Sequence, residues 1–173
     1  MNVKVKPLDA EPASEAASSG ADVLHRVLIV DDSRLQRKIL CSSVKRWGFE
    51  VYEAGSGEEA VQSARDGQPD LVVSDWMMPG MNGLEFCDEF RKLSGERYGY
   101  FNLLTSKSEK NEIAMGLEAG ADDFVTKPVD ANELRARIAA GERILRMQRE
   151  LTEKNRLITD TLDELQRVYD SLD

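Results

Sequence analysis

Short runs of branched apolar residues alternate with longer amphipathic segments between residues 26 and 140. The run that leads into Asp75 is too short for a helix and is typical of a strand buried on both faces of a sheet, whereas Phe49–Ala54 alternates between apolar and polar residues. The predicted strands are Arg26–Val30, Phe49–Ala54, Leu71–Asp75, Tyr100–Thr105 and Asp123–Thr126.

The segments between these runs have apolar residues at helical spacing. The predicted helices cover residues 34–47, 57–67, 83–93 and 109–119, and a last helix starts after Asp130. Capping pairs at Ser56/Glu59, Asn82/Glu85 and Asp130/Glu133 mark three helix starts. The first helix carries an apolar face of Leu35, Ile39, Leu40, Val44 and Trp47. Fivefold strand–helix alternation predicts a parallel, doubly wound, flavodoxin-like α/β domain over residues 25–140.

The segments on either side of this domain differ in character. Residues 1–24 are rich in Ala, Ser, Glu and Pro and have little to bury, so we expect a disordered tail. Residues 141–173 continue the last helix without a proline, and we expect a helix of roughly 60 Å.

Apolar residues recur every seven positions in that extension, which is typical of a coiled coil. Ile144, Leu151, Ile158, Leu165 and Leu172 take one seam position, and Gln148, Asn155, Leu162 and Tyr169 take the other. We expect a parallel homodimer in which Asn155 fixes the register. A second register, with Met147, Lys154, Thr161 and Val168 in the seam, remains open.

The net charge of −9 over 173 residues gives no support for binding to nucleic acid or to an anionic membrane. No apolar run is long enough to span a membrane. Cys41 and Cys87 lie far apart in helical segments and are interpreted as buried thiols. His25 is the only histidine, and we expect an exposed residue at a strand edge. A cytoplasmic location is the simplest expectation.

Polar side chains close the predicted strands at one edge of the sheet. Asp31 and Asp32 follow the first strand, Asp75 ends the third, Thr105 ends the fourth and Lys127 follows the fifth. Carboxyl ends of parallel strands share one crevice, so we expect these groups to converge. Three carboxylates there need a cation, and an all-oxygen ligand set favours Mg²⁺. A lysine and a hydroxyl beside the metal suit phosphoryl transfer to a carboxylate.

The motifs at these strand ends resemble the receiver domain of bacterial two-component response regulators. They are Val-Asp-Asp-Ser at 30–33, Asp-Trp-Met-Met-Pro-Gly-Met-Asn-Gly at 75–83, Leu-Thr-Ser at 104–106 and Gly-Ala-Asp-Asp-Phe-Val-Thr-Lys-Pro at 120–128. The resemblance implies that Asp75 accepts phosphate from a histidine kinase or phosphotransfer protein.

The resemblance also implies roles for the neighbouring residues. Asp31, Asp32, Asp75 and the backbone carbonyl of Met77 would hold Mg²⁺, and Thr105 and Lys127 would bind phosphoryl oxygens. Phe124 would be an aromatic switch residue, and the Lys127–Pro128 bond would be cis.

Three functions fit these features. The first is a phosphorylation-controlled dimeric switch that is not itself an enzyme. Its helical pattern runs on to Asp173 and would lead into an output domain, such as a diguanylate cyclase or a PP2C-like phosphatase, or the coil itself would be the output. The second is a constitutive dimerisation scaffold or adaptor, although no acceptor, metal or lysine position is missing. The third is a Mg²⁺ phosphohydrolase, which would need a second carboxylate at position 77, where the chain has methionine.

Overall fold

The five apolar runs form one parallel sheet in the order β2-β1-β3-β4-β5. The computed structural model describes residues 25–95, 97–106 and 110–172, so the predicted disordered tail lies outside the described residues. The strands are β1 Arg26–Val30, β2 Glu50–Ala54, β3 Leu71–Asp75, β4 Tyr100–Thr105 and β5 Asp123–Thr126. β3 and β4 are buried along their whole length, which explains why they are continuous rather than alternating apolar runs.

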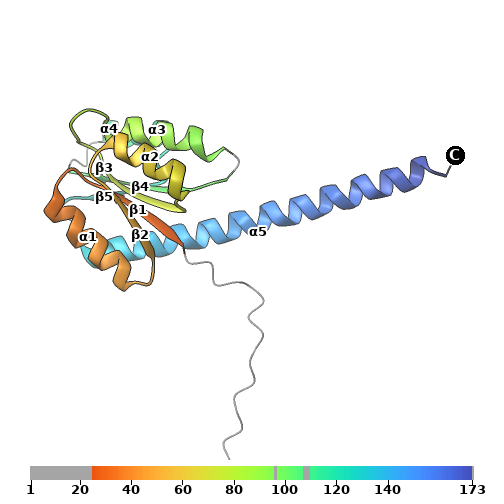
Figure 1. The fold of residues 1–173 in the computed structure, drawn as a ribbon, viewed down its shortest axis with the longest axis horizontal. Coiled ribbons are helices and arrows are strands. Elements are labelled where there is room, and N and C mark those ends of the chain that lie inside the picture. The colour runs from red at the N-terminus through yellow and green to blue at the C-terminus, as the bar shows by residue number, and fades with distance from the viewer. Residues whose placement is uncertain (1–24, 96, 107–109, 173) are drawn as a thin grey trace, which may run out of the picture.

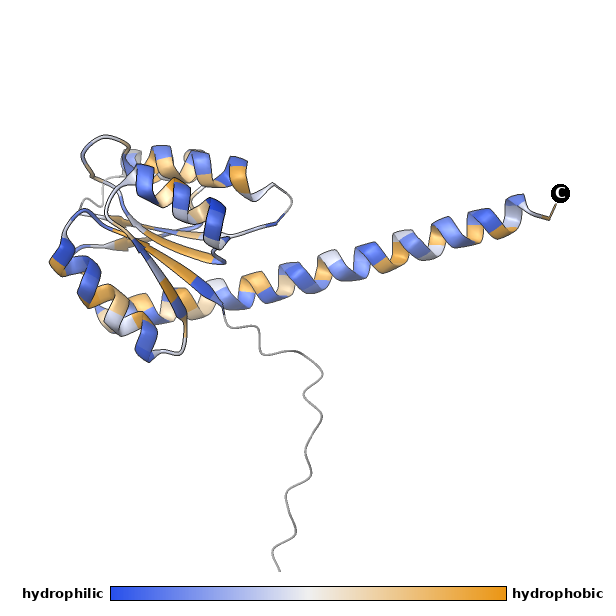
Figure 2. Ribbon diagram, viewed as in Figure 1, coloured by the Kyte–Doolittle hydropathy of each residue, from blue (hydrophilic) through white to orange (hydrophobic). Residues whose placement is uncertain are grey.

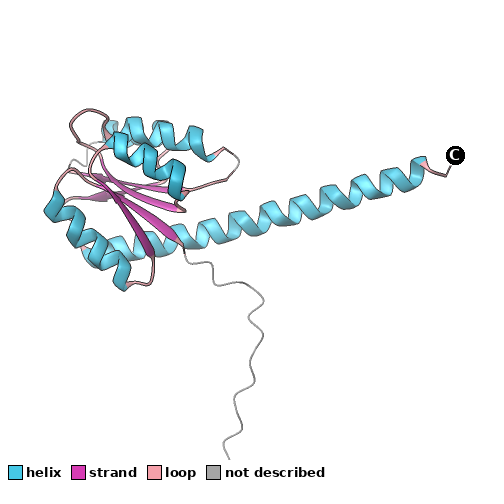
Figure 3. Cartoon of the chain, viewed as in Figure 1, coloured by secondary structure: helices cyan, strands magenta, loops and turns pink. Residues whose placement is uncertain are grey.

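Helices cover both faces of this sheet (Figures 1 and 3). They are α1 Arg34–Arg46, α2 Gly57–Gly67, α3 Gly83–Ser94, α4 Lys110–Ala119 and α5 Ala131–Asp170. α2, α3 and α4 lie on one face, and α1 and the first part of α5 lie on the other (Figure 1). One buried core, which includes Phe86, Phe90 and Phe101, fills the first interface, and a second, which includes Val73, Leu134 and Ile138, fills the other. The predicted doubly wound α/β fold is confirmed.

Three helices begin with the predicted capping residue. The side chains of Ser56, Asn82 and Asp130 each accept a hydrogen bond from the main-chain N–H three residues later, at 3.1, 2.9 and 2.9 Å. Glu59 departs from the reciprocal pattern, because its carboxylate accepts from the Gly55 N–H at 2.7 Å. Each helix start is therefore set by a local hydrogen bond between a cap and the first turn.

The predicted apolar face of α1 is partly wrong. Leu40 and Val44 are buried, but Leu35 and Ile39 are 71% and 58% exposed. They lie about 100–140° around the helix from Leu40, because successive residues turn by about 100°. The apolar band of α1 is therefore wider than the face that the sheet covers. β2 also begins one residue later than predicted, at Glu50.

α5 has two parts with different surroundings. Its first turns pack on the sheet through Leu134, Ile138, Gly141 and Leu145. A Cβ at Gly141 would lie 2.5 Å from the ring of Tyr100, so glycine allows this close approach. From residue 150 to residue 172 every side chain is exposed, and the helix extends away from the domain with apolar residues between charged ones (Figure 2). Within the described ranges, no helix combines the length and apolar character that a membrane crossing requires.

A buried carboxylate ties α5 to the amino end of the sheet. Asp70 is 2% exposed and accepts hydrogen bonds from the Arg26 N–H at 2.9 Å and from the guanidinium groups of Arg97 and Arg149 at 2.7 and 2.5 Å. The His25 ring lies between two carboxylates: its Nδ1 is 3.8 Å from Asp70 Oδ2, and its Nε2 is 3.6 Å from Glu142 Oε1. The prediction that His25 is exposed is wrong, because its side chain is only 15% exposed under these partners.

Burial raises the pKa of Asp70, but the hydrogen bonds from Arg26, Arg149 and Arg97 outweigh it and bring the pKa below the usual 3.8. A depressed folded-state pKa contributes stability above pH 3.8, and this contribution is lost as the pH falls through the folded-state value. We expect Asp70→Asn to lower the free energy of unfolding by about 2–3 kcal/mol at pH 7, because it breaks a buried charged network.

Urea denaturation between pH 7 and pH 3 measures this effect. The difference between wild type and Asp70→Asn should shrink below about pH 4. Asp66→Asn, which changes an exposed carboxylate bonded to Gln62, serves as the control and should cause little change. A difference that stays constant through the acid range would contradict the assignment.

Asn102 is a buried polar residue without compensation. It is fully buried in β4 between Tyr100 and Leu104, on the face that α5 covers. Neither its Nδ2 nor its Oδ1 has a hydrogen-bond partner among the described residues. An unsatisfied buried amide costs free energy, so Asn102 weakens the interface between the sheet and α5.

Asn102→Leu, which replaces the carboxamide with an apolar group of the same heavy-atom count, should therefore raise the free energy of unfolding by about 1–2 kcal/mol. Asn102→Asp should lower it, since an unpaired buried charge costs more than an amide. Thermal and urea unfolding of both variants test this expectation. A loss of stability in Asn102→Leu would show that the carboxamide is hydrogen-bonded after all.

Candidate functional site

Three carboxylates meet at the carboxyl edge of the two central strands. Asp31 and Asp32 directly follow β1, and Asp75 is the last residue of β3, which pairs with β1. One oxygen of each lies within 4.8 Å of the others. Asp31 and Asp75 are 1% and 5% exposed, whereas Asp32 is exposed to solvent. The predicted convergence of the acidic residues is thus observed.

Most of the polar atoms of Asp31 have a protein partner. Its N–H donates to the carbonyl of Ala54 at 3.2 Å, its carbonyl accepts from Arg37 Nη1 at 2.6 Å, and its Oδ1 accepts from the Ser33 N–H at 2.9 Å. Its Oδ2 is buried and has no hydrogen-bond partner among the described residues. Burial raises the pKa of Asp31, the Ser33 N–H opposes this, and the charge of Asp75 adds to the increase.

Lys127 supplies a positive charge to the cluster. Its Nζ lies 2.7 Å from Asp75 Oδ1, and the side chain is 22% exposed. The Lys127 N–H donates to the carbonyl of Thr105 at 2.7 Å, which joins the ends of β4 and β5. Thr105 is buried beside this edge, and the Lys127–Pro128 bond is cis, as expected. Lys127, Thr105 and the carboxylate of Asp75 therefore lie at one rim of the sheet.

Gly83 allows the loop after β3 to fold back on the site. A Cβ at Gly83 would lie 2.2 Å from the carbonyl oxygen of Asp75, so a side chain has no room there. The Gly83 N–H donates to the carbonyl of Trp76 at 2.8 Å. In the sequence Gly83 indicated only a turn, and its contact with Asp75 could not be predicted from it.

The remaining predicted site residues lie around this rim. The Met77 side chain is 72% exposed, and Trp76 is buried at the core edge. Phe124 is partly buried and packs on the α3-side core, where a Cβ at Gly116 of α4 would come within 2.5 Å of its ring. Phe124 thus lies against α4, while its switch role and the role of the Met77 carbonyl stay predictions.

Two hollows are lined by residues from this edge of the sheet. One, of about 200 Å³, is lined by Asp31, Gln36, Ile39, Leu40, Leu104, Lys127, Pro128 and Val129. The other, of about 240 Å³, is lined by Trp76, Met77, Thr105, Ser106, Glu112 and Met115. The first hollow therefore opens onto Asp31 and Lys127, and the second onto Thr105.

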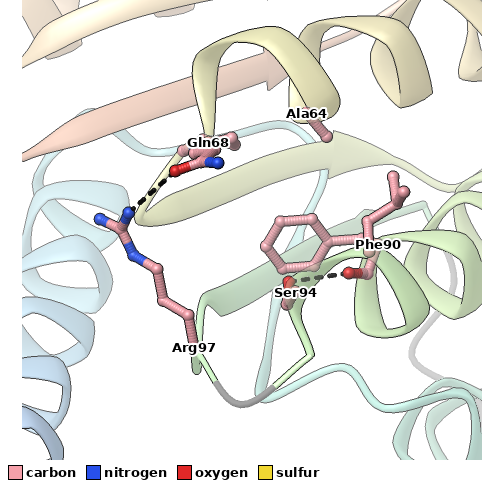
Figure 4. A pocket seen from close by; sticks show the side chains of 7 residues that line it. Ala64, Gln68, Phe90, Ser94 and Arg97 are labelled. Carbon is pink, nitrogen blue, oxygen red and sulfur yellow. Dashed lines mark hydrogen bonds between the residues drawn. The ribbon is translucent and has the colours of Figure 1, made fainter.

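A third hollow, of about 120 Å³, lies between the ends of α2 and α3 (Figure 4). It is at the amino end of the strands, away from Asp75. Arg97 lines it but bonds Gln68 at 3.3 Å and Asp70 at 2.7 Å, so its charge is already satisfied. Nothing in this hollow matches the chemistry of the acidic edge.

The cysteines take no part in a metal site. Both are free and buried, as predicted. Burial, with the charge of Glu53 beside Cys41, raises the pKa of Cys41 to about 11, and burial raises that of Cys87 to about 12. Protonated thiols are poor ligands and poor nucleophiles.

The acidic cluster fits a magnesium ion. Its ligands are all oxygen, which is the donor type that Mg²⁺ prefers. The buried Oδ2 of Asp31 has no hydrogen-bond partner among the described residues, and the nearby Lys127 Nζ is bonded to Asp75 at 2.7 Å, so a cation that contacts Oδ2 would be favourable. Magnesium would satisfy this atom and reduce the repulsion among the three carboxylates.

Comparison with known proteins shows the family to which the chain belongs. Residues 27–139 match the model of the response regulator receiver domain. The chain is 37% identical over 115 residues to the phosphate regulon transcriptional regulatory protein PhoB of Escherichia coli, covering 66% of this chain and 50% of PhoB. It is 39% identical over 115 residues to the DNA-binding response regulator MtrA of Mycolicibacterium smegmatis, covering 66% and 49%. The chain thus spans about half the length of these relatives.

Solved structures agree with this comparison. The chemotaxis response regulator CheY4 of Vibrio cholerae superposes with a TM-score of 0.65 at 29% identity, over 68% of this chain and 98% of CheY4. A two-component system response regulator/GGDEF domain protein gives a TM-score of 0.66 at 25% identity, over 71% of this chain and 51% of that one. Receiver domains are phosphorylated by histidine kinases or phosphotransfer proteins and bind Mg²⁺ at their acidic pocket. The chain belongs to the response regulator receiver family of two-component signalling.

Proposed function

We propose that Asp75 is the phosphoacceptor of a Mg²⁺-dependent response regulator. The observation that carries this is the cluster of Asp75, Asp31 and Asp32, with Lys127 Nζ 2.7 Å from Asp75 Oδ1. Asp31, Asp32, Asp75 and the Met77 carbonyl would hold the metal. When bound, the metal would neutralise charge on the phosphoryl group.

The residues of the chain have separate tasks in this transfer. A carboxylate oxygen of Asp75 attacks phosphorus, the bond from phosphorus to the donor histidine nitrogen breaks, and an acyl phosphate forms. Lys127 moves from the carboxylate to a phosphoryl oxygen, and the Thr105 hydroxyl donates to another. Main-chain contacts at Asp31, Gly83 and Lys127 hold the groups in place before transfer.

The donor would be a histidine kinase or a phosphotransfer protein. Leu35 and Ile39 offer an exposed apolar surface on α1, and Ile39 lines the hollow that contains Asp31 and Lys127. A protein that presents a phosphohistidine to Asp75 could bury these side chains. This use would account for the two α1 residues that the sheet leaves uncovered.

Phosphorylation would change the packing around the rim. The phosphoryl group adds roughly −1.5 to −2 charge, by analogy with other phosphorylated side chains. Drawing Thr105 towards it would open space for Phe124, whose ring lies against Gly116 of α4. The change would reach α5, because β5 leads directly into that helix.

Incubation with acetyl phosphate and Mg²⁺ tests the acceptor directly. We expect the wild type to gain one phosphoryl group that hydroxylamine removes, and Asp75→Asn to gain none. Asp88→Asn, which alters an exposed carboxylate paired with Lys92, is the matched control and should be labelled like the wild type. Intact mass spectrometry measures the product. Equal labelling of Asp75→Asn would exclude Asp75 as the acceptor, and labelling of the wild type that survives removal of Mg²⁺ would contradict the Mg²⁺ dependence.

We also propose that the extension of α5 forms a parallel homodimer. Ile144, Leu151, Ile158, Leu162, Leu165 and Leu172 are 43–77% exposed along one side of the helix. Ile144 and Leu151 lie about 100–120° around the helix from the buried Leu145, so the helix could pair without leaving its own domain. The exposed residues of the second register, including Met147 and Val168, leave that register open. Asn155 in the seam would favour two strands.

Ile158→Glu should raise the dimer dissociation constant at least about 100-fold, because it buries an unpaired charge in the seam. Arg167→Glu alters the charge on the outer side of the helix and should leave the dimer intact. Analytical ultracentrifugation over a range of concentrations measures both. A wild type that stays monomeric, or an Ile158→Glu variant that keeps the wild-type mass, would contradict the dimer.

The output remains part of the proposal. We expect control of an output domain or partner, with a diguanylate cyclase or PP2C-like phosphatase as the first candidates, and no enzymatic activity of the receiver beyond its own phosphoryl chemistry. PhoB and MtrA are named as transcriptional or DNA-binding regulators. We propose no nucleic-acid binding for this chain, because its net charge is −9. Two unpaired buried thiols fit a reducing, cytoplasmic location.

The alternatives receive less support. A constitutive scaffold would not need the complete set of Asp31, Asp75, Thr105 and Lys127 at one rim. A phosphohydrolase would need a second carboxylate at position 77, where an exposed methionine stands.

A further inference from the structure

The side chain of Arg37 runs from α1 back to the acidic edge of the sheet. Arg37 lies in the first turns of α1, and side chains on a helix point towards its amino end. Its Nη1 donates to the carbonyl oxygen of Asp31 at 2.6 Å, and its side chain is only 16% exposed. A long cationic side chain is thus held against the main chain of a metal-site residue.

A longer contact joins the guanidinium to β2. Arg37 Nε forms an ion pair with Glu53 Oε2 at 3.8 Å but has no hydrogen-bond partner among the described residues, and Glu53 Oε2 accepts from Cys41 Sγ at 3.6 Å. A Cβ at Gly55 would lie 3.1 Å from Nη1, so the glycine leaves room for the guanidinium. Arg37 therefore joins α1, the end of β1 and the end of β2.

These contacts leave Asp31 with one free atom. Its N–H, carbonyl and Oδ1 are held by Ala54, Arg37 and Ser33, while the buried Oδ2 has no partner among the described residues. One of the two carboxylate oxygens of Asp31 lies within 4.8 Å of an oxygen of Asp32 and of an oxygen of Asp75. A small rotation of the Asp31 peptide would move this carboxylate away from the cluster.

We propose that Arg37 is a positioning residue for magnesium, which holds the Asp31–Asp32 loop in the conformation that lets the three carboxylates share one cation. The proposal rests on the proposed function, because it takes the acidic cluster to be the metal site. It assigns Arg37 no contact with the metal or with the phosphoryl group.

Charge and position make opposite predictions for this residue. Arg37 carries a positive charge near the site, so an effect of charge alone would let Mg²⁺ bind more tightly once the charge is removed. Loss of positioning would make Mg²⁺ bind more weakly, typically by about 10-fold or more for a residue that orients a metal ligand. The sign of the change therefore separates the two effects.

Mg²⁺ titration of Trp76 fluorescence provides the measurement. Trp76 follows Asp75 directly, and Trp47→Phe in every protein removes the other of the two tryptophans. We expect Arg37→Met to raise the Mg²⁺ dissociation constant by about 10-fold. Arg37→Lys keeps the charge but lacks the planar guanidinium, so its affinity for Mg²⁺ should lie between those of the wild type and Arg37→Met. Arg34→Met removes an exposed charge from the same helix turn and should not weaken binding.

Two further readings separate positioning from general stability. The melting temperature without Mg²⁺ shows whether each variant is folded, and if Arg37→Met does not fold, Arg37→Lys decides the outcome. At saturating Mg²⁺, Arg37→Met should be labelled by acetyl phosphate as fast as the wild type. Only the Mg²⁺ concentration that gives half of the maximal rate should be higher.

An unchanged or tighter Mg²⁺ affinity in folded Arg37→Met would overturn the positioning role. So would an equal weakening in Arg34→Met. If the fluorescence of the wild type does not change with Mg²⁺, both the role of Arg37 and the proposed metal site are overturned. If the wild type and Arg37→Met bind Mg²⁺ equally tightly, only the role of Arg37 is overturned.

Discussion

Mutual repulsion among Asp31, Asp32 and Asp75 is the constraint on which the rest of the structure depends. Two unit charges about 4 Å apart repel by about 4 kcal/mol near a protein surface, so such a cluster needs compensation. Lys127 compensates Asp75 at 2.7 Å, but the buried Oδ2 of Asp31 has no partner among the described residues. The strand order, the tight turn at Gly83 and the bond from Arg37 hold the carboxylates together despite this cost.

The main features of the fold could be predicted because they depend on local signals. Continuous apolar runs indicated the buried strands, and the caps at Ser56, Asn82 and Asp130 marked helix starts. The convergence of Asp31, Asp75 and Lys127 followed from their positions at the ends of parallel strands.

Features that depend on contacts between distant elements could not be predicted in this way. The exposure of Leu35 and Ile39 depends on how α1 rotates on the sheet, and apolar spacing alone does not fix that rotation. The burial of His25 depends on Asp70 and on Glu142, which is more than 100 residues away in the chain. The bond from Arg37 to Asp31 is visible only when the side chain is placed. Tertiary packing therefore determines the exposure and the partners of these residues, which the sequence alone did not.

Two kinds of contact attach α5 to the domain. Leu134, Ile138 and Leu145 hold it on the sheet, and Arg149 ties it to the buried Asp70. Asn102, whose amide has no hydrogen-bond partner among the described residues, lies on the same face of the sheet, and we expect it to weaken that attachment. A helix held by a few specific contacts and loosened by one polar residue is suited to shift when the rim changes.

The most direct test of the central claim is a crystal structure of the protein with Mg²⁺ and beryllofluoride, which mimics a phosphoryl group on aspartate. The account predicts beryllofluoride on Asp75, contacted by Lys127 and Thr105, and one Mg²⁺ held at about 2.1 Å by oxygens from the set of Asp31, Asp32, Asp75 and the Met77 carbonyl. Beryllofluoride on another residue, or an acidic cluster that stays metal-free at saturating Mg²⁺, would contradict it.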